Sequence, residues 1–286
     1  MNCLLRSWLS CGFLVGAVGT SASAALLDRN GATRFFTADD ASTISNNGPA
    51  DGNATWVDPV SSTGPDTFTF DAETVVINAV TGGSTVVENA IAFDGTLAAS
   101  TASPFASSTP TATFEFFVRP EANPNTAASL LFETGGSGNG LSVGFTNANQ
   151  VAVSTEVGFT LEGSLAGIDL AEFLQIVVVH DGPNDLVSLY INGALAGSTD
   201  QLTDSVTEAV GGNNAASLGG AATSSINLGV STENFTGEIA GFRFYAGTAL
   251  NSTQVSDSYT AFVPEPSTMA LTVLGGTLIA VRRRHA

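Results

Sequence analysis

The sequence offers few of the side-chain combinations that catalysis requires. Asp71 and Glu73 form its one Asp-x-Glu pair, and two carboxylates of this kind flank the bond that a glycosidase cleaves. No third carboxylate continues the alternation, so a turn or strand-edge role is the other interpretation of this pair. His180 is the only histidine between residues 25 and 263, and no Gly-x-Ser-x-Gly pattern supplies a nucleophile for it. We therefore predict that the chain is not an enzyme and that His180 is structural or solvent-facing.

A short acidic turn is the candidate metal site. Asp181, Asn184 and Asp185 lie within five residues of one another, and calcium takes six to eight oxygen ligands of this kind. Asp94 and Glu233 are further acidic residues at predicted loop ends. Calcium is thus the one cofactor that the sequence suggests, and a solvated turn without metal is the alternative.

Two aromatic residues are candidates for stacking against a sugar ring. Trp56 and Tyr190 combine a large apolar surface with a polar tip. The other aromatic residues are mostly phenylalanine, which the chain contains 18 times against 3 tyrosines and 2 tryptophans. Phenylalanine at strand spacing indicates a hydrophobic core, and ordinary core or sheet packing is the alternative for Trp56.

The charge of the chain excludes one class of partner. Its 286 residues include 26 acidic and 8 basic side chains, a formal charge of −18, and every basic residue is arginine. Nucleic-acid binding needs a basic surface, so we predict no nucleic-acid partner. Hydrophobic residues make up 43% of the chain and charged residues 12%, which favours a folded core over disorder.

Residues 1–24 have the pattern of a secretory signal peptide. Arg6 provides the positive start, an apolar run follows at 12–18, and small residues precede Ala25. An uncleaved N-terminal membrane anchor is the alternative. The only cysteines, Cys3 and Cys11, lie in this segment, so thiolate metal sites are excluded from the mature protein.

The C-terminal segment, residues 263–286, predicts a short hydrophobic helix with a sorting signal. It contains Pro264, Glu265 and Pro266, an uncharged run at 269–281, and Arg282, Arg283 and Arg284. A helix of 13 residues spans about 20 Å, less than the roughly 30 Å of a hydrocarbon core. This three-part tail resembles the PEP-CTERM signal. The resemblance implies transient inner-membrane anchoring, cleavage by an exosortase-like membrane protease, and export to the cell surface or extracellular matrix. A plain short C-terminal anchor is the alternative.

Between these ends, short strands and turns predict an all-β fold. Phe114, Phe116 and Val118 alternate onto one face, and so do Val187, Leu189 and Ile191. The unbroken apolar run 173–180 is typical of a strand buried on both faces. Asn192-Gly193 favours a type I′ turn, and 251–259 predicts a short helix capped by Asn251 or Ser252. The pattern indicates an antiparallel β-sandwich.

Three stretches resemble the laminin-G-like jelly roll of the concanavalin A-like lectin/glucanase superfamily. They are Ala90–Gly95, Leu174–Gly182 with the hairpin Leu189–Gly193, and Gly237–Tyr245 with the helix after it. The resemblance covers about 90–262, whereas 25–89 carries weaker signals within the same predicted domain. Phe173 stands near the place where the family commonly has tryptophan, which keeps an aromatic residue in the core.

The resemblance implies a binding protein rather than an enzyme. We expect a non-catalytic cell-surface or matrix protein that binds an extracellular polysaccharide or a surface partner. A structural surface protein without a ligand site is one alternative, and a divergent polysaccharide hydrolase is another.

Overall fold

The computed structural model describes the chain in segments. They are residues 32, 34–37, 55–57, 67–70, 76–79, 89–96, 98–101, 108–121, 128–134, 140–155, 159–199, 210–211, 216–220 and 233–262. The predicted signal peptide 1–24, the tail 263–286 and the Asp71–Glu73 pair lie outside these residues. Within them, no helix is both long enough and apolar enough to cross a membrane.

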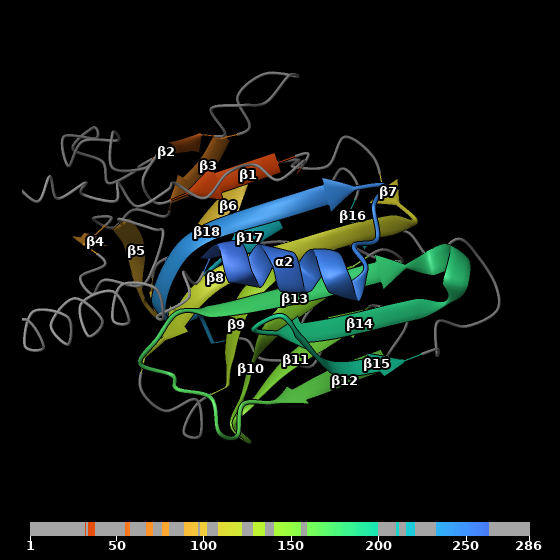
Figure 1. Cartoon of the computed structure of the whole chain (residues 1–286). Helices are drawn as coiled ribbons and strands as arrows, with labels where there is room; N and C mark the ends of the chain where they lie inside the picture. Colours follow the sequence, from red (N-terminus) through yellow and green to blue (C-terminus); the bar gives the residue numbers. More distant parts are fainter. Residues whose placement is uncertain are drawn as a thin grey trace, which may run out of the picture.

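In the described part of the chain, the strands form two antiparallel eight-stranded sheets (Figure 1). The first, sheet A, runs in the order β15 (Ala194–Thr199), β14 (Leu186–Ile191), β13 (Leu174–Asp181), β8 (Thr111–Pro120), β18 (Thr236–Ala246), β5 (Asn89–Asp94) and β4 (Val76–Ala79). Strand β1 (Arg34–Thr37) pairs with the second half of β18. It lies along the same edge of β18 as β5, which pairs with the first half of that strand.

The second, sheet B, runs in the order β12 (Phe159–Ser164), β11 (Gln150–Thr155), β10 (Leu141–Thr146), β9 (Ser129–Thr134), β17 (Ala216–Leu218), β6 (Ala99–Thr101), β3 (Thr67–Phe70) and β2 (Thr55–Val57). Strands β7 (Ser108–Thr109) and β16 (Val210–Gly211) form a separate pair. A 3-10 turn, η1 (Gly182–Asn184), links β13 to β14, and helix α2 (Ser252–Phe262) follows β18. The predicted antiparallel β-sandwich with a short helix after its last strand is confirmed.

Phenylalanine rings fill the space between the sheets. Phe114, Phe116 and Phe242 from sheet A surround Phe132 from sheet B, with ring centroids 5.1–5.4 Å apart in the contacting pairs. Burying each such side chain stabilises the fold by about 1.5–3 kcal/mol. Their alternation with outward-facing residues along β8 is the pattern that the sequence predicts.

Sheet A is buried on its outer face as well. Helix α2 lies across β18, β8 and β13, as Figure 1 shows. Leu174, Ile176 and Val178 face the inter-sheet core, whereas Val177 and Val179 belong to the second cluster, which includes residues of α2. This arrangement confirms that β13 is buried on both faces and supplies the reason.

A buried ion pair within sheet A holds α2 through Ser258. Glu115 and Arg243 are 0% and 2% exposed, and Arg243 Nε lies 2.8 Å from Glu115 Oε2. Tyr245 Oη donates to Glu115 Oε2, while Gln175 Nε2 and Ser258 Oγ donate to Oε1 at 2.6 and 2.5 Å. Arg243 Nη2 also donates to Ser258 Oγ at 2.8 Å. Because Ser258 belongs to α2, the network fixes the helix over the sheet and satisfies the buried charges.

Local signals in the sequence set the turn and the helix start. Asn192 and Gly193 have φ of 50° and 75°, the left-handed values that a type I′ turn requires. Asn192 Oδ1 accepts a hydrogen bond from the Gln175 amide at 2.9 Å. Asn251 is the helix cap, because its Oδ1 accepts from the Gln254 amide and its own amide donates to Gln254 Oε1.

Candidate functional site

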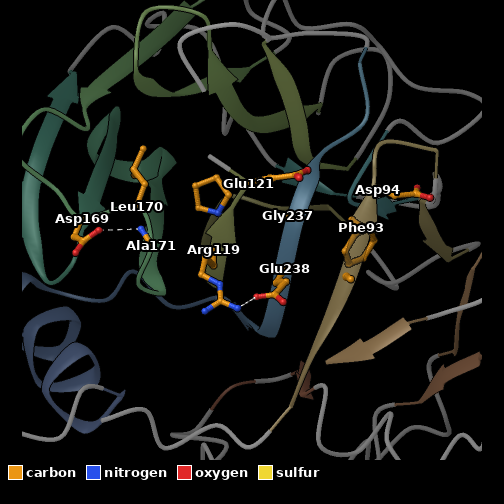
Figure 2. A pocket seen from close by; sticks show the side chains of 11 residues that line it. Phe93, Asp94, Arg119, Glu121, Asp169, Leu170, Ala171, Gly237 and Glu238 are labelled. Carbon is orange, nitrogen blue, oxygen red and sulfur yellow. Dashed lines mark hydrogen bonds and ion pairs between the residues drawn. The ribbon is translucent and has the colours of Figure 1, made fainter. Parts of the chain in front are cut away.

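An open pocket of about 780 Å³ lies at one end of sheet A (Figure 2). Its lining comes from four segments: Ala92–Asp94 of β5, Arg119–Glu121 at the end of β8, Gly237–Glu238 of β18, and Asp169–Ala171. The last segment belongs to the connection from β12 to β13, which passes from sheet B to sheet A. The pocket thus lies where three adjacent strand ends meet a crossing loop.

Backbone features end the strands at the pocket. Asp94 Oδ1 accepts hydrogen bonds from the Thr96 amide and hydroxyl at 2.9 and 2.7 Å, so β5 ends in an Asx turn. Pro120 cannot donate to a ladder, and the Glu121 amide then bonds to the Thr236 carbonyl at 3.0 Å. The strand ends are therefore held in place before any ligand arrives.

The centre of the pocket is a cross-strand ion pair. Arg119 and Glu238 are direct partners on β8 and β18, and Arg119 Nη2 contacts Glu238 Oε2. Figure 2 shows the two side chains pointing toward each other. The Arg119 guanidinium also lies 4.8 Å from the centre of the Phe173 ring, a cation–π distance. At 33% and 15% side-chain exposure, the pair is reachable from the pocket yet fixed in orientation.

The loop wall of the pocket is tied to the core. The Leu165 amide donates to the Asn149 carbonyl at 3.0 Å, and Leu165 itself is 1% exposed. Ile168 and Leu170 are partly buried against the inter-sheet core. Asp169 Oδ1 accepts from the Ala171 amide at 3.0 Å, which fixes the loop that presents these side chains. The wall is consequently preformed, as ligand sites usually are.

The pocket combines apolar surface with an excess of negative charge. Asp94, Glu121, Asp169 and Glu238 bring four carboxylates, and Arg119 brings one guanidinium. Apolar surface comes from Ala92, Phe93, Pro120, Leu170 and Ala171. A volume within roughly 300–1,000 Å³ with a few convergent polar groups suits a small polar ligand such as a sugar unit.

The residues predicted from the sequence do not gather at this pocket. The turn with Asp181, Asn184 and Asp185 follows the far end of β13, eight residues or roughly 26 Å away at 3.3 Å per residue. Tyr190 is 8% exposed and packs in the cluster beneath α2, which leaves little of its ring for a sugar. Trp56 lies in β2, opposite Phe68 at the edge of sheet B.

The acidic turn is organised by its own hydrogen bond. Asn184 Nδ2 donates to Asp181 Oδ2 at 2.7 Å, and Asp185 adopts a left-handed φ of 51°. In the part of the chain that the structure describes, no three His, Cys, Asp or Glu side chains are grouped so as to hold a metal ion. Calcium binding here stays a prediction. A saturable calcium-dependent rise in melting temperature that Asp181→Asn abolishes would support it.

His180 is a buried structural residue. It is 1% exposed, and its Nδ1 lies 3.1 Å from the Pro110 carbonyl oxygen, which accepts the proton of that nitrogen. Burial lowers the pKa of His180, while the Pro110 carbonyl and Asp181 oppose the shift. The structural interpretation drawn from the sequence agrees with this position.

A row of buried polar side chains crosses the outer face of sheet B. The residues Ser217, Glu133, Ser142 and Ser154 are cross-strand neighbours on four adjacent strands. The three serines are at most 1% exposed. This row is therefore not open to a ligand, and the pocket on sheet A is the candidate site.

Two facing antiparallel sheets with a pocket at the strand ends define a lectin-like β-sandwich. Residues 92–256, more than half of the chain, match the laminin G family model of the concanavalin A-like lectin/glucanases superfamily. The chain belongs to this superfamily, as its three sequence motifs indicated. No curated protein matches the chain.

Solved structures are similar to the chain at low sequence identity. Domain 4 of AbnA, a GH43 extracellular arabinanase from Geobacillus stearothermophilus in complex with arabinotriose, matches with a TM-score of 0.52 and 20% identity over 80% of this chain and 98% of that chain. A Ruminococcus gnavus IT-sialidase CBM40 bound to α2,6 sialyllactose matches with a TM-score of 0.42 and 20% identity, over 54% and 85%. A SAP-like pentraxin from Limulus polyphemus has a TM-score of 0.48 and 16% identity, over 62% and 84%.

Proposed function

We propose that this chain is an exported, non-catalytic carbohydrate-binding protein and that its pocket on sheet A receives a sugar unit of an extracellular polysaccharide. The preformed pocket of about 780 Å³ is the observation that carries the proposal. Its carboxylates accept hydrogen bonds from hydroxyl groups, and its apolar surface suits the C–H face of a sugar ring. The arabinanase domain with the same fold is described in complex with arabinotriose, which supports a carbohydrate as the ligand.

The proposal includes how the protein reaches its ligand. The segments 1–24 and 263–286 carry the signal-peptide and PEP-CTERM patterns described above. An exosortase-like membrane protease would cleave near Pro264–Pro266 after transient anchoring and release the sandwich at the cell surface. Detection of a tail-less form outside the cell, and its loss in a Pro264→Ala/Pro266→Ala variant, would support this route.

A pocket-filling pair of variants tests the binding site. Ala171 lines the pocket, whereas Ala166 is exposed in the same loop and is not among the lining residues. Ala171→Trp should abolish retardation of the full-length protein in gels that contain extracellular polysaccharide from the organism that produces the protein. Ala166→Trp adds the same ring outside the pocket and should leave retardation unchanged. Equal retardation of both variants and the wild type would place the binding elsewhere, and no retardation of the wild type would refute carbohydrate binding.

A further inference from the structure

The charge of the pocket restricts the ligand that it can accept. Four carboxylates and one guanidinium line it, a formal charge of −3. The side chains of Asp94, Glu121 and Asp169 are exposed, so a ligand entering from solvent meets three carboxylates at the rim. The surrounding protein strengthens this field, because the whole chain carries −18.

The single guanidinium is already engaged. Arg119 contacts Glu238 and lies over the Phe173 ring. A uronate, sulfate or other anionic group that binds Arg119 must share its positive charge with the Glu238 carboxylate, which already contacts Nη2. Anionic sugars are therefore disfavoured both by repulsion from the exposed carboxylates and because Glu238 already neutralises much of the charge of Arg119.

A protonated amine complements the negative charge of the pocket. An ammonium group has three donors and no acceptor, so it pairs with carboxylates without competing for Arg119. Glu121 lies at the end of β8 and Asp169 in the crossing loop, on separate segments of the lining. Leu170 and Ala171, next to Asp169, offer apolar surface to the ring that carries the amine.

We infer that the pocket prefers a cationic glycan, a polysaccharide with free amino groups, over neutral or anionic polymers. This inference rests on the proposed function and adds the charge class of the ligand at the same site. Attraction to such a ligand is electrostatic in part, so binding weakens as salt is added.

The test compares three oligosaccharides of equal length: a β-1,4-linked glucosamine oligomer, its fully N-acetylated counterpart, and a uronate oligomer. Calorimetry uses the full-length protein in mild detergent at pH 6, where the amines are protonated. The double variant Glu121→Gln/Asp169→Asn removes two charges and preserves side-chain shape. Glu162→Gln/Asp257→Asn, at two exposed positions outside the pocket, is the matched control with the same net charge.

The expected result is tightest binding of the glucosamine oligomer, weakened roughly tenfold by Glu121→Gln/Asp169→Asn and much less by the control. Two partly screened pairs of up to about 1 kcal/mol each account for a change of this size. Unchanged melting temperatures would show that both double variants fold.

The other outcomes each overturn a distinct statement. Tighter binding of the N-acetylated or uronate oligomer would refute the charge preference and leave carbohydrate binding standing. Equal weakening by the control variant would refute the pocket as the source of the preference. Equally tight binding of an oligolysine peptide would show charge attraction without sugar recognition. If no oligomer and no extracellular polysaccharide binds, the proposed function itself fails.

Discussion

Removing Arg243 should destabilise the protein far more than removing Arg119. Each arginine pairs with a glutamate across β8 and β18, yet Arg243 is 2% exposed and Arg119 is 33% exposed. Arg243→Met would leave the Glu115 carboxylate, 0% exposed, without its positive partner. Losing one member of a buried pair costs about 3–5 kcal/mol, whereas an exposed pair is worth about 0–1 kcal/mol.

The magnitude translates into a measurable shift in melting temperature. For a domain of this size, 1 kcal/mol corresponds to roughly 2–4 °C. Arg243→Met should therefore lower the melting temperature by about 6–20 °C, and Arg119→Met by less than about 4 °C. Thermal unfolding by circular dichroism and urea titration of the full-length protein would measure both. Methionine keeps much of the apolar volume of arginine, so cavity formation contributes little to the difference.

A third variant separates lost charge pairing from lost packing. In Glu115→Gln/Arg243→Met no buried charge remains, and an amide oxygen at the Oε1 position still accepts from Ser258 and Gln175. The amide NH2 then replaces Oε2 and donates to the Tyr245 hydroxyl, which donates to Oε2 in the wild type. The stability of this double variant should lie between those of Arg243→Met and the wild type. Equal losses for Arg243→Met and Arg119→Met, or a double variant less stable than Arg243→Met, would refute the reasoning.

Three further predictions concern the turn, the helix cap and the buried histidine. Asn192→Ala should lower the free energy of unfolding by about 1–3 kcal/mol, through backbone strain at φ 50° and loss of the hydrogen bond from the Gln175 amide. Asn192→Gly should lose only the hydrogen bond, because glycine adopts this φ without strain. Equal urea midpoints for the two variants would contradict this. Asn251→Ala should cost about 1 kcal/mol by removing the α2 cap, and Asn251→Asp should retain the capping oxygen and most of the stability. Burial lowers the pKa of His180 below the 6.5 of a free imidazole, so its contribution to stability is complete above about pH 6.5 and is lost as the pH falls toward the folded-state pKa. His180→Gln should flatten the fall in stability between pH 7 and 5 by at most about 1.4 kcal/mol per pH unit, and identical slopes would show that His180 does not titrate with unfolding.

Local patterns predicted the strands and turns well, because each depends on neighbouring residues. The alternation of Phe114, Phe116 and Val118 gave the face of β8 that meets the core. Asn192-Gly193 predicted its turn from the positive φ that both positions require. The run 173–180 indicated burial on both faces but could not show what covers the outer one. That cover is α2, whose contact with Glu115 joins residues 143 positions apart in sequence.

The pocket could not be predicted in the same way. Arg119 and Glu238 become neighbours only because β18 pairs with β8, and Asp169 reaches them by a loop from the other sheet. One signal was present: Arg119 is one of four arginines between residues 25 and 263. In so acidic a chain, each arginine has many possible partners, so sequence alone could not choose Glu238. The surroundings of Tyr190 could not be predicted either, since local alternation does not show that its face of the sheet lies beneath α2.

Helix α2 packs against the core up to its last residue, just before the predicted cleavage segment. Phe262, the last residue that the structure describes, is 0% exposed, and its ring centre lies 4.3 Å from that of Phe117. Ser258, one turn earlier, is held by the Glu115–Arg243 pair. Among the described residues, core contacts thus extend to within two positions of Pro264, near which the proposed protease would cut. If the proposed cleavage takes place there, it would act on a chain that is already folded, and it would leave the contacts of α2 with the core intact.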